Sequence, residues 1–134
     1  MPYLTELTED YMGVIHTGTG LVTGEEVLQG CEMVSQLVQN TENFHYKFVD
    51  LAEATGIEMT EEHLQEIVAI DRTMAFFRPN ATVVIVAPDE RLFAVAKQWE
   101  KLVEALGWAT HVSRERSEAL AWLRENFPAE PVKR

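Results

Sequence analysis

The stretch Thr82–Ala87 (TVVIVA) decides the fold of this chain. It is a continuous run rich in β-branched residues without polar alternation, which is typical of a central parallel strand covered on both faces. Pro88 and Asp89 follow at once and open a long helix, and Gly107 is placed to end it because glycine favours the position after a helix C-terminus. A buried strand that leads directly into a helix is the building unit of an α/β sheet.

Strand and helix patterns alternate along the rest of the chain as well. Phe44–Leu51 (FHYKFVDL) alternates aromatic and polar residues as a strand does, and apolar residues recur at three- to four-residue spacing in the expected helices. Further strands are expected over Tyr3–Leu7, Tyr11–Thr19, Phe44–Leu51 and Ala109–Ser113, and further helices from the caps Thr23, Thr60 and Ser117 to near Asn40, Phe77 and Phe127. The segment Ala52–Met59, which carries Gly56, is expected to be a loop.

The expected order is β-β-α-β-α-β-α-β-α, which predicts a single α/β domain with four helices. Because strands and helices alternate strictly from the third strand on, the sheet should be mixed but mostly parallel, with right-handed crossovers. The polar turn Thr8–Asp10 between the first two strands predicts an antiparallel hairpin at the N-terminus. The domain is expected to cover residues 1–127, and the tail 128–134 (PAEPVKR) to be flexible because two prolines interrupt it.

Charge and composition argue against several classes of function. The formal net charge is −11, from 22 acidic and 11 basic residues, and such a field repels phosphate backbones and anionic lipid head groups. We therefore expect no nucleic-acid binding, and no membrane insertion either, since no apolar run approaches the ~20 residues that span a bilayer. A protein partner with a basic surface fits the charge. The single cysteine, Cys31, excludes an internal disulfide and, with the lack of a signal-peptide pattern, predicts a cytoplasmic protein.

No catalytic or metal-binding signature is present in the sequence. The glycines of residues 17–24 (TGTGLVTG) are spaced G-x-G-x-x-x-G, which is neither a dinucleotide fingerprint nor a phosphate loop. The four histidines are scattered, Cys31 lies on an apolar helix face, and no G-x-S-x-G elbow occurs. We therefore predict a non-enzymatic protein with no cofactor, no metal and no catalytic residue. An enzyme would need a site that these patterns do not reveal.

The element order, the step FVDL…MTEEHLQEI and the TVVIVAP strand before a long helix together resemble the STAS-like domains. These domains include anti-sigma-factor antagonists, the regulatory tails of sulfate transporters and distant lipid carriers of the Sec14 type. The resemblance covers Tyr3 to Phe127 and implies a regulatory, protein-binding module.

The antagonist branch of this family carries a phosphorylatable serine or threonine near the start of the helix that follows the third strand. By this resemblance only Thr60 can stand in for it, and the rest of the Asp-Ser-Ser-Gly-like motif is missing from Glu58–Glu62 (EMTEE). A helix N-terminus favours a phosphate, whereas Glu61 and Glu62 would repel one. Thr60 is therefore either a plain N-cap or a phosphoacceptor.

The start of this second helix is the first candidate site, as a surface that docks a protein partner. Asp50 and Glu53 lie at the carboxyl end of a strand, where sites in open α/β sheets are found. Thr60, Glu61 and Glu62 continue the surface into the helix. The resemblance points to the same place, because partners of STAS-like regulators dock at this helix start.

The alternative is a carrier of a small ligand or lipid. The second helix holds more large apolar residues than one face needs, and the Sec14-type relatives carry lipids. An apolar cleft under this helix would be lined by Leu64, Val68, Met74 and Phe77. Separately, the edge strand of the N-terminal hairpin can pair across a two-fold axis, so a homodimer is also expected.

Overall fold

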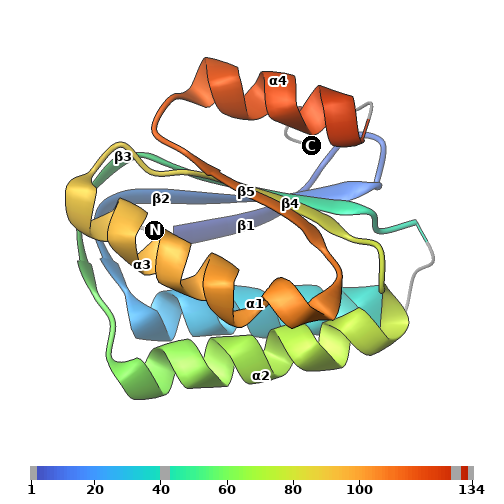
Figure 1. Cartoon of the computed structure of the whole chain (residues 1–134), viewed down its shortest axis with the longest axis horizontal. Helices are drawn as coiled ribbons and strands as arrows, with labels where there is room; N and C mark the ends of the chain where they lie inside the picture. The colour runs from blue at the N-terminus through green and yellow to red at the C-terminus, as the bar shows by residue number, and fades with distance from the viewer. Residues whose placement is uncertain (1–2, 40–42, 128–130, 133–134) are drawn as a thin grey trace.

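The structure, a computed structural model, describes residues 3–39, 43–127 and 131–132 (Figure 1). These residues form five strands and four α-helices in the predicted order, together with one 3-10 helix. The strands are β1 (Tyr3–Leu7), β2 (Gly13–Thr23), β3 (Tyr46–Glu58), β4 (Thr82–Val86) and β5 (Ala109–Ser113). The helices are α1 (Gly24–Gln39), α2 (Glu61–Phe77), α3 (Glu90–Leu102), the 3-10 helix η1 (Glu104–Leu106) and α4 (Arg116–Asn126).

Two predicted boundaries fall outside this range. The expected end of the first helix at Asn40 lies outside the described residues, and so does most of the tail 128–134. Of that tail, residues 131 and 132 are described, and the carbonyl oxygen of Val132 accepts a hydrogen bond of 3.1 Å from the backbone N–H of Glu9. The flexibility of the tail stays a prediction.

The strands form one sheet in the order β1-β2-β3-β4-β5. β1 pairs antiparallel with β2 and the other pairs are parallel, which confirms the predicted hairpin and the mixed, mostly parallel sheet. Because successive parallel strands are neighbours, right-handed crossovers place α1, α2 and α3 on the same face of the sheet. Figure 1 shows these three helices below the sheet and α4 alone above it.

The predicted loop over Ala52–Met59 is wrong, because strand β3 continues to Glu58. This extension pairs with β2, in which Thr23 is the partner of Glu58. Beyond an irregular step at Ala52 and Glu53, the side chains alternate, with Ala54 buried and Thr55 exposed. Backbone pairing to a distant segment therefore overrides the turn preference of this glycine-containing stretch.

Two helix caps are as predicted. At the start of α1, Thr23 Oγ1 accepts a hydrogen bond of 3.2 Å from the N–H of Glu26, whose carboxylate accepts one of 3.1 Å from the N–H of Thr23. At the start of α2, Thr60 Oγ1 accepts from the N–H of His63 at 3.0 Å, and His63 Nδ1 accepts from the N–H of Thr60 at 3.2 Å. Both arrangements are reciprocal capping boxes that satisfy the free donors of a helix start.

The predicted cap of the last helix is wrong by two residues. Helix α4 begins at Arg116 with Glu115 in the N-cap position, whereas Ser117 lies inside the helix. The hydroxyl of Ser113 accepts a hydrogen bond of 3.1 Å from the N–H of Glu115 and donates one of 2.9 Å to its carbonyl oxygen. This local turn directs the chain into the helix earlier than the cap residue implied.

The sheet has a hydrophobic core on each face. β4 is buried at every residue, which confirms the central strand predicted from TVVIVA. The larger core lies between the sheet and α1, α2 and α3, and the smaller one lies under α4. The smaller core is formed by Ile15, Tyr46, Phe48, Val84, Val86, Ala119 and Leu123.

Gly13→Ala is expected to destabilise the protein by about 1–3 kcal/mol, as overpacking of a closed core does. A Cβ atom at this position would collide with the fully buried ring of Tyr46. Gly56→Ala is the matched control, since its Cβ would meet Leu21 and Arg91 at an ordinary 3.5 Å. Urea unfolding of both variants measures the difference, and an equal loss of stability in the two would contradict this packing.

Candidate functional site

The predicted position of Asp50 and Glu53 at a strand end is wrong, because both lie within β3, which runs on to Glu58. Asp50 is level with Val86, the last residue of the neighbouring β4. The Oδ1 atom of Asp50 accepts a hydrogen bond of 3.1 Å from the N–H of Ala52, and its Oδ2 atom is 3.1 Å from Nε of Arg116 on α4. Glu53 is exposed on the β3 extension. Asp50 is thus held by an ion pair to α4, while Glu53 faces solvent.

The predicted residues of α2 form the exposed first turn of that helix. Glu61 accepts hydrogen bonds from Gln65 at 3.0 Å and from Gln98 of α3 at 3.4 Å, and Glu62 is exposed. The Nε2 atom of His63 lies 4.0 Å from the carboxylate of Glu25 on α1. The start of α2 therefore contacts the start of α1 and the C-terminal half of α3.

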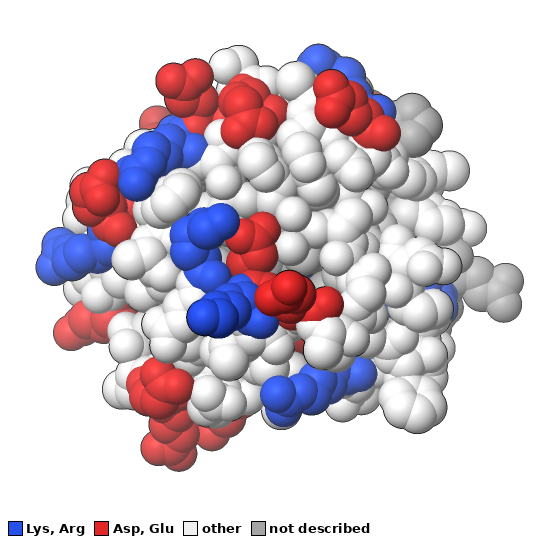
Figure 2. Space-filling view, viewed as in Figure 1, with Lys and Arg blue, Asp and Glu red and all other residues white. Residues whose placement is uncertain are grey.

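Carboxylates thus follow the end of β3 into the first turn of α2. We call the exposed residues Glu53, Glu58, Glu61 and Glu62 the acidic edge. Glu53 and Glu58 stand on a strand instead of the loop that the sequence predicted, and Glu61 and Glu62 stand on the predicted helix, so the spacing of all four is fixed by the fold. On the face drawn in Figure 2, acidic and basic side chains are interspersed, with no broad basic area.

A cavity of about 80 Å³ lies inside the larger core, between the sheet and helices α1, α2 and α3. Most of its lining is aliphatic, but Tyr3, His16, Cys31, Lys47, Asp71 and Trp99 also line it. Of the four residues predicted for a cleft under the second helix, Leu64 lines this cavity. Val68 and Met74 are buried in the core outside the lining, and Phe77 is 47% exposed.

An ion pair that the sequence analysis missed spans this cavity wall. Lys47 Nζ of β3 lies 3.7 Å from Asp71 Oδ1 of α2, and the two side chains are 5% and 0% exposed. Trp99 Nε1 of α3 donates a hydrogen bond of 2.7 Å to Asp71 Oδ2. One signal was present, because Asp71 falls on the same helix stripe as the apolar Leu64 and Met74.

Burial acts on both charges of this pair. It would lower the pKa of Lys47, but the interactions with Asp71 and Cys31 together more than offset this and the pKa lies above its ordinary value. Burial raises the pKa of Asp71, and the charge of Lys47 and the hydrogen bond from Trp99 offset only part of this rise. The pair is therefore held by mutual compensation in a place that is buried from bulk solvent.

His16 on β2 completes the polar part of the cavity. Its Nδ1 atom is 2.9 Å from Thr5 Oγ1, and its ring stacks on Tyr3 with centroids 5.4 Å apart. Burial, together with repulsion from Lys47, lowers the pKa of His16 well below its usual range. The imidazole is therefore neutral at physiological pH.

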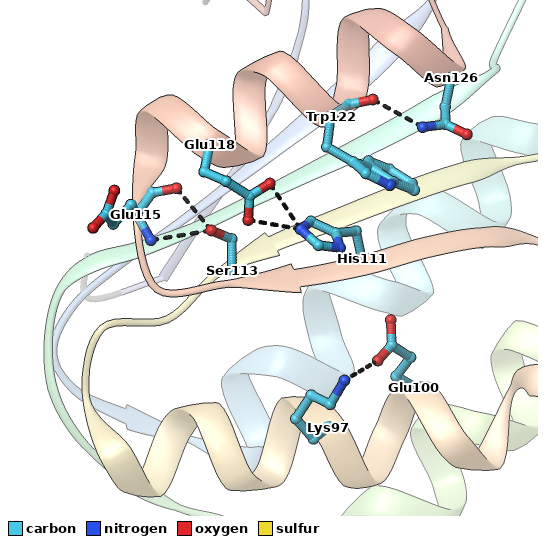
Figure 3. Close-up of polar contacts among 8 residues, drawn as sticks. All are labelled: Lys97, Glu100, His111, Ser113, Glu115, Glu118, Trp122 and Asn126. Carbon is cyan, nitrogen blue, oxygen red and sulfur yellow. Dashed lines mark hydrogen bonds and ion pairs between the residues drawn. The ribbon is translucent and has the colours of Figure 1, made fainter.

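Besides His63 and Glu25, a second histidine–carboxylate pair lies on the face of the sheet that α4 covers (Figure 3). His111 Nε2 of β5 is 2.8 and 2.9 Å from the two carboxylate oxygens of Glu118 on α4, and its ring stacks on Trp122 at 5.0 Å. The hydrogen bond from His111 lowers the pKa of Glu118. Figure 3 shows the Ser113 hydroxyl directed at the backbone of Glu115 and not at His111, so the three do not align as a catalytic triad.

The described residues also bear on metal binding and on membrane crossing. Within the described ranges, no three His, Cys, Asp or Glu side chains are grouped so as to hold a metal ion. Among the described helices, none combines the length and apolar character needed to cross a membrane.

Asp71→Ala should destabilise the protein by about 3–5 kcal/mol, because it leaves the buried Lys47 charge without a counter-ion. Asp50→Ala is the control, since the Asp50–Arg116 pair is more exposed, at 20% and 53% of the two side chains. It should cost less than about 1 kcal/mol. Chemical unfolding of the two variants tests this order, and a small effect of Asp71→Ala would show that the pair does not hold α2 to the sheet.

Cys31 should react slowly with thiol reagents in the folded protein. Its side chain is buried and burial raises its pKa to about 12, from an ordinary value of 9.0. At pH 8 the thiolate fraction is then about a thousandfold lower than in an unfolded chain. Labelling with a chromogenic disulfide reagent, with and without denaturant, measures the ratio; equal rates would mean that the thiol reaches solvent.

Comparison with known proteins places this geometry in a fold. No family model matches the sequence, and no curated protein does either. Among solved structures, the anti-sigma-factor antagonist SpoIIAA in its unphosphorylated form aligns with TM-score 0.59 and 11% identity, over 91% of this chain and 97% of that one. An uncharacterised Shewanella loihica protein described as SpoIIAA-like aligns with TM-score 0.57 and 14% identity, over 90% and 91%. The chain therefore has the SpoIIAA-like fold of STAS-like domains, as its sequence pattern indicated.

Proposed function

We propose that this protein is a non-enzymatic regulatory domain that binds a protein partner through the acidic edge. The observation that carries the proposal is the set of exposed carboxylates along the β3 extension and the first turn of α2. They are presented on rigid elements, so little conformational freedom is lost when a partner binds. The similarity in fold to an anti-sigma-factor antagonist supports a regulatory role of this kind.

The chemistry of the edge specifies the partner's surface. Glu53, Glu58, Glu61 and Glu62 belong to a chain of net charge −11, so a basic surface is attracted and an acidic one is repelled. Arg91 at the start of α3 is exposed beside Gly56 and limits the edge on one side. A cytoplasmic partner is in keeping with the single buried cysteine.

Thr60 bears on how the docking would be regulated. Its hydroxyl caps α2. A phosphate on this hydroxyl would remove the cap and would stand beside the carboxylates of Glu61 and Glu62. Phosphorylation of Thr60 would therefore change the charge and the local structure of the acidic edge together. Intact-mass analysis of protein purified from its own host detects such a phosphate.

The non-enzymatic part of the proposal has its own support. Strongly perturbed titrating groups often mark active sites. Here His16, Lys47 and Asp71 are all buried and engaged in contacts that join elements of the core. Their shifted pKa values are thus accounted for by packing.

A second candidate function, a carrier of a small ligand, is favoured by one observation. The cavity of about 80 Å³ lies under α2, where the sequence predicted a cleft, and Leu64 of the predicted lining faces it. The exposed edge strand β1, with Leu4 41% exposed, supports in addition the proposal of a homodimer.

Glu61→Lys together with Glu62→Lys is expected to weaken partner binding at least about tenfold, because it reverses two of the four charges of the acidic edge. The partner is first obtained as the protein that co-purifies at fixed stoichiometry from the native host, identified by native mass spectrometry. Its affinity for the variant is then measured by calorimetry.

The matched control is Glu125→Lys, a charge reversal at an exposed position of α4 on the opposite face of the sheet. It should change the affinity for the partner by less than about twofold, since Glu125 lies away from the acidic edge and interactions between solvent-exposed charges are screened beyond about 10 Å. Circular dichroism establishes that both variants are folded. Unchanged binding by the folded Glu61/Glu62 variant would refute docking at this edge.

A further inference from the structure

Two buried polar atoms on the cavity wall lack a hydrogen-bond partner within the described residues. They are Asp71 Oδ1 and His16 Nε2, and the two residues are 0% and 1% exposed. Lys47 Nζ lies 3.7 Å from Asp71 Oδ1, beyond hydrogen-bond distance. Buried polar groups are paired in the great majority of proteins, so unpaired ones on a cavity wall indicate an occupant.

The size of the cavity limits that occupant. A water molecule needs about 10–15 Å³ of such volume, so a space of about 80 Å³ holds more than one water. It is about half the volume of the engineered cavity of roughly 150 Å³ that accepts benzene. A molecule of about four non-hydrogen atoms is of the right size.

The charges on the cavity wall determine which polar group a bound molecule can carry. A carboxylate or an ammonium group would bring a third charge into a buried site where Lys47 and Asp71 already neutralise each other, and it would lose its hydration there. A purely apolar molecule would leave Asp71 Oδ1 and His16 Nε2 unpaired. A hydroxyl both donates and accepts, so it can donate to Asp71 Oδ1 and accept from Lys47 Nζ and from His16 in the tautomer that is protonated at Nε2.

We propose that the cavity binds a small uncharged molecule made of a hydroxyl group on a short aliphatic body. The inference rests on the second candidate function, that the cavity admits a ligand, and it names the ligand's class. The hydroxyl lies against His16, Lys47 and Asp71, and the aliphatic part lies against the apolar remainder of the wall.

The route into the cavity is marked by the lining residues that are only partly buried. These are Val27 near the start of α1, Ile57 and Met59 at the end of β3, and Val95 on α3. Three of these four positions adjoin the starts of α1 and α2, next to the acidic edge. The ligand therefore enters beside the surface proposed for docking.

The test is a methyl NMR titration of the intact protein with three probes that share a three-carbon body and with one apolar probe. The probes are 1-propanol, propionate, propylamine and xenon, at pH 7. We expect 1-propanol to shift the methyl signals of lining residues such as Val27, Ile57 and Leu64 saturably. Propionate and propylamine should bind at least about tenfold more weakly, because each buries a charge that the neutral Lys47–Asp71 pair does not compensate.

A double variant, Lys47→Met with Asp71→Leu, separates the polar part of the site from the cavity itself. Replacing both members of a buried ion pair by apolar residues of similar size is often tolerated. The N–H of Trp99 loses its acceptor at a cost of about 1–3 kcal/mol, so circular dichroism first establishes that the variant is folded. It is expected to bind xenon and to lose the preference for 1-propanol over xenon about tenfold. Glu118→Gln, on the opposite face of the sheet, should bind all four probes as the parent does.

The outcomes distinguish the inference from the function on which it rests. If the charged probes or xenon bind the parent as tightly as 1-propanol, the cavity admits ligands but the hydroxyl assignment is wrong. If no probe moves a lining methyl, both the assignment and the carrier function fail, whereas docking at the acidic edge is unaffected. If the double variant keeps the full preference for 1-propanol, the polar cluster does not recognise the hydroxyl.

Discussion

The arrangement of this molecule depends on the buried contact between Lys47 and Asp71. One residue is on the sheet and the other on α2, and Trp99 of α3 donates a hydrogen bond to the same carboxylate. Two charges removed from water are tolerated only when they neutralise one another, so the pair admits essentially one placement of α2 against β3. Apolar side chains alone would allow the helix to slide by small amounts at little cost.

This placement of α2 has two consequences, one at its N-terminus and one beneath it. At its N-terminus the capping box of Thr60 and His63 and the contact of Glu61 with Gln98 set the helix against its neighbours. The acidic edge is thereby a rigid surface. Beneath the same helix, polar side chains of the pair and of His16 occupy positions that aliphatic residues would otherwise fill, and a cavity remains between them. The proposed docking surface and the proposed ligand site are two results of the same constraint.

Much of the fold could be predicted from local sequence patterns. The run TVVIVA identified the central strand, and Thr23 and Thr60 identified two helix starts, because buried strands and N-caps are determined by nearby residues. The β3 extension could not be predicted, since it depends on pairing with residues of β2 that are far away in the sequence. The start of α4 depends on a hydrogen-bonded turn at Ser113, which a conventional cap at Ser117 obscured.

The candidate site divides in the same way. Its acidic residues could be named from the sequence because they surround a recognisable helix start, whereas their presentation on a strand required the structure. The polar part of the cavity was missed: Lys47 read as an ordinary strand residue and Asp71 as one polar residue on a helix, and only packing brings them to 3.7 Å. A cavity results from the fit of side chains on three helices and a sheet, which no local pattern reports.

The most direct test of docking at the acidic edge is amide hydrogen exchange of the protein with and without its co-purified partner. The account predicts slower exchange in the complex over residues 53–66, which span the β3 extension and the first turns of α2. Exchange in α4 should be unchanged. Protection confined to β1 and α1, or to α4, would contradict the account and place the interface elsewhere on the molecule.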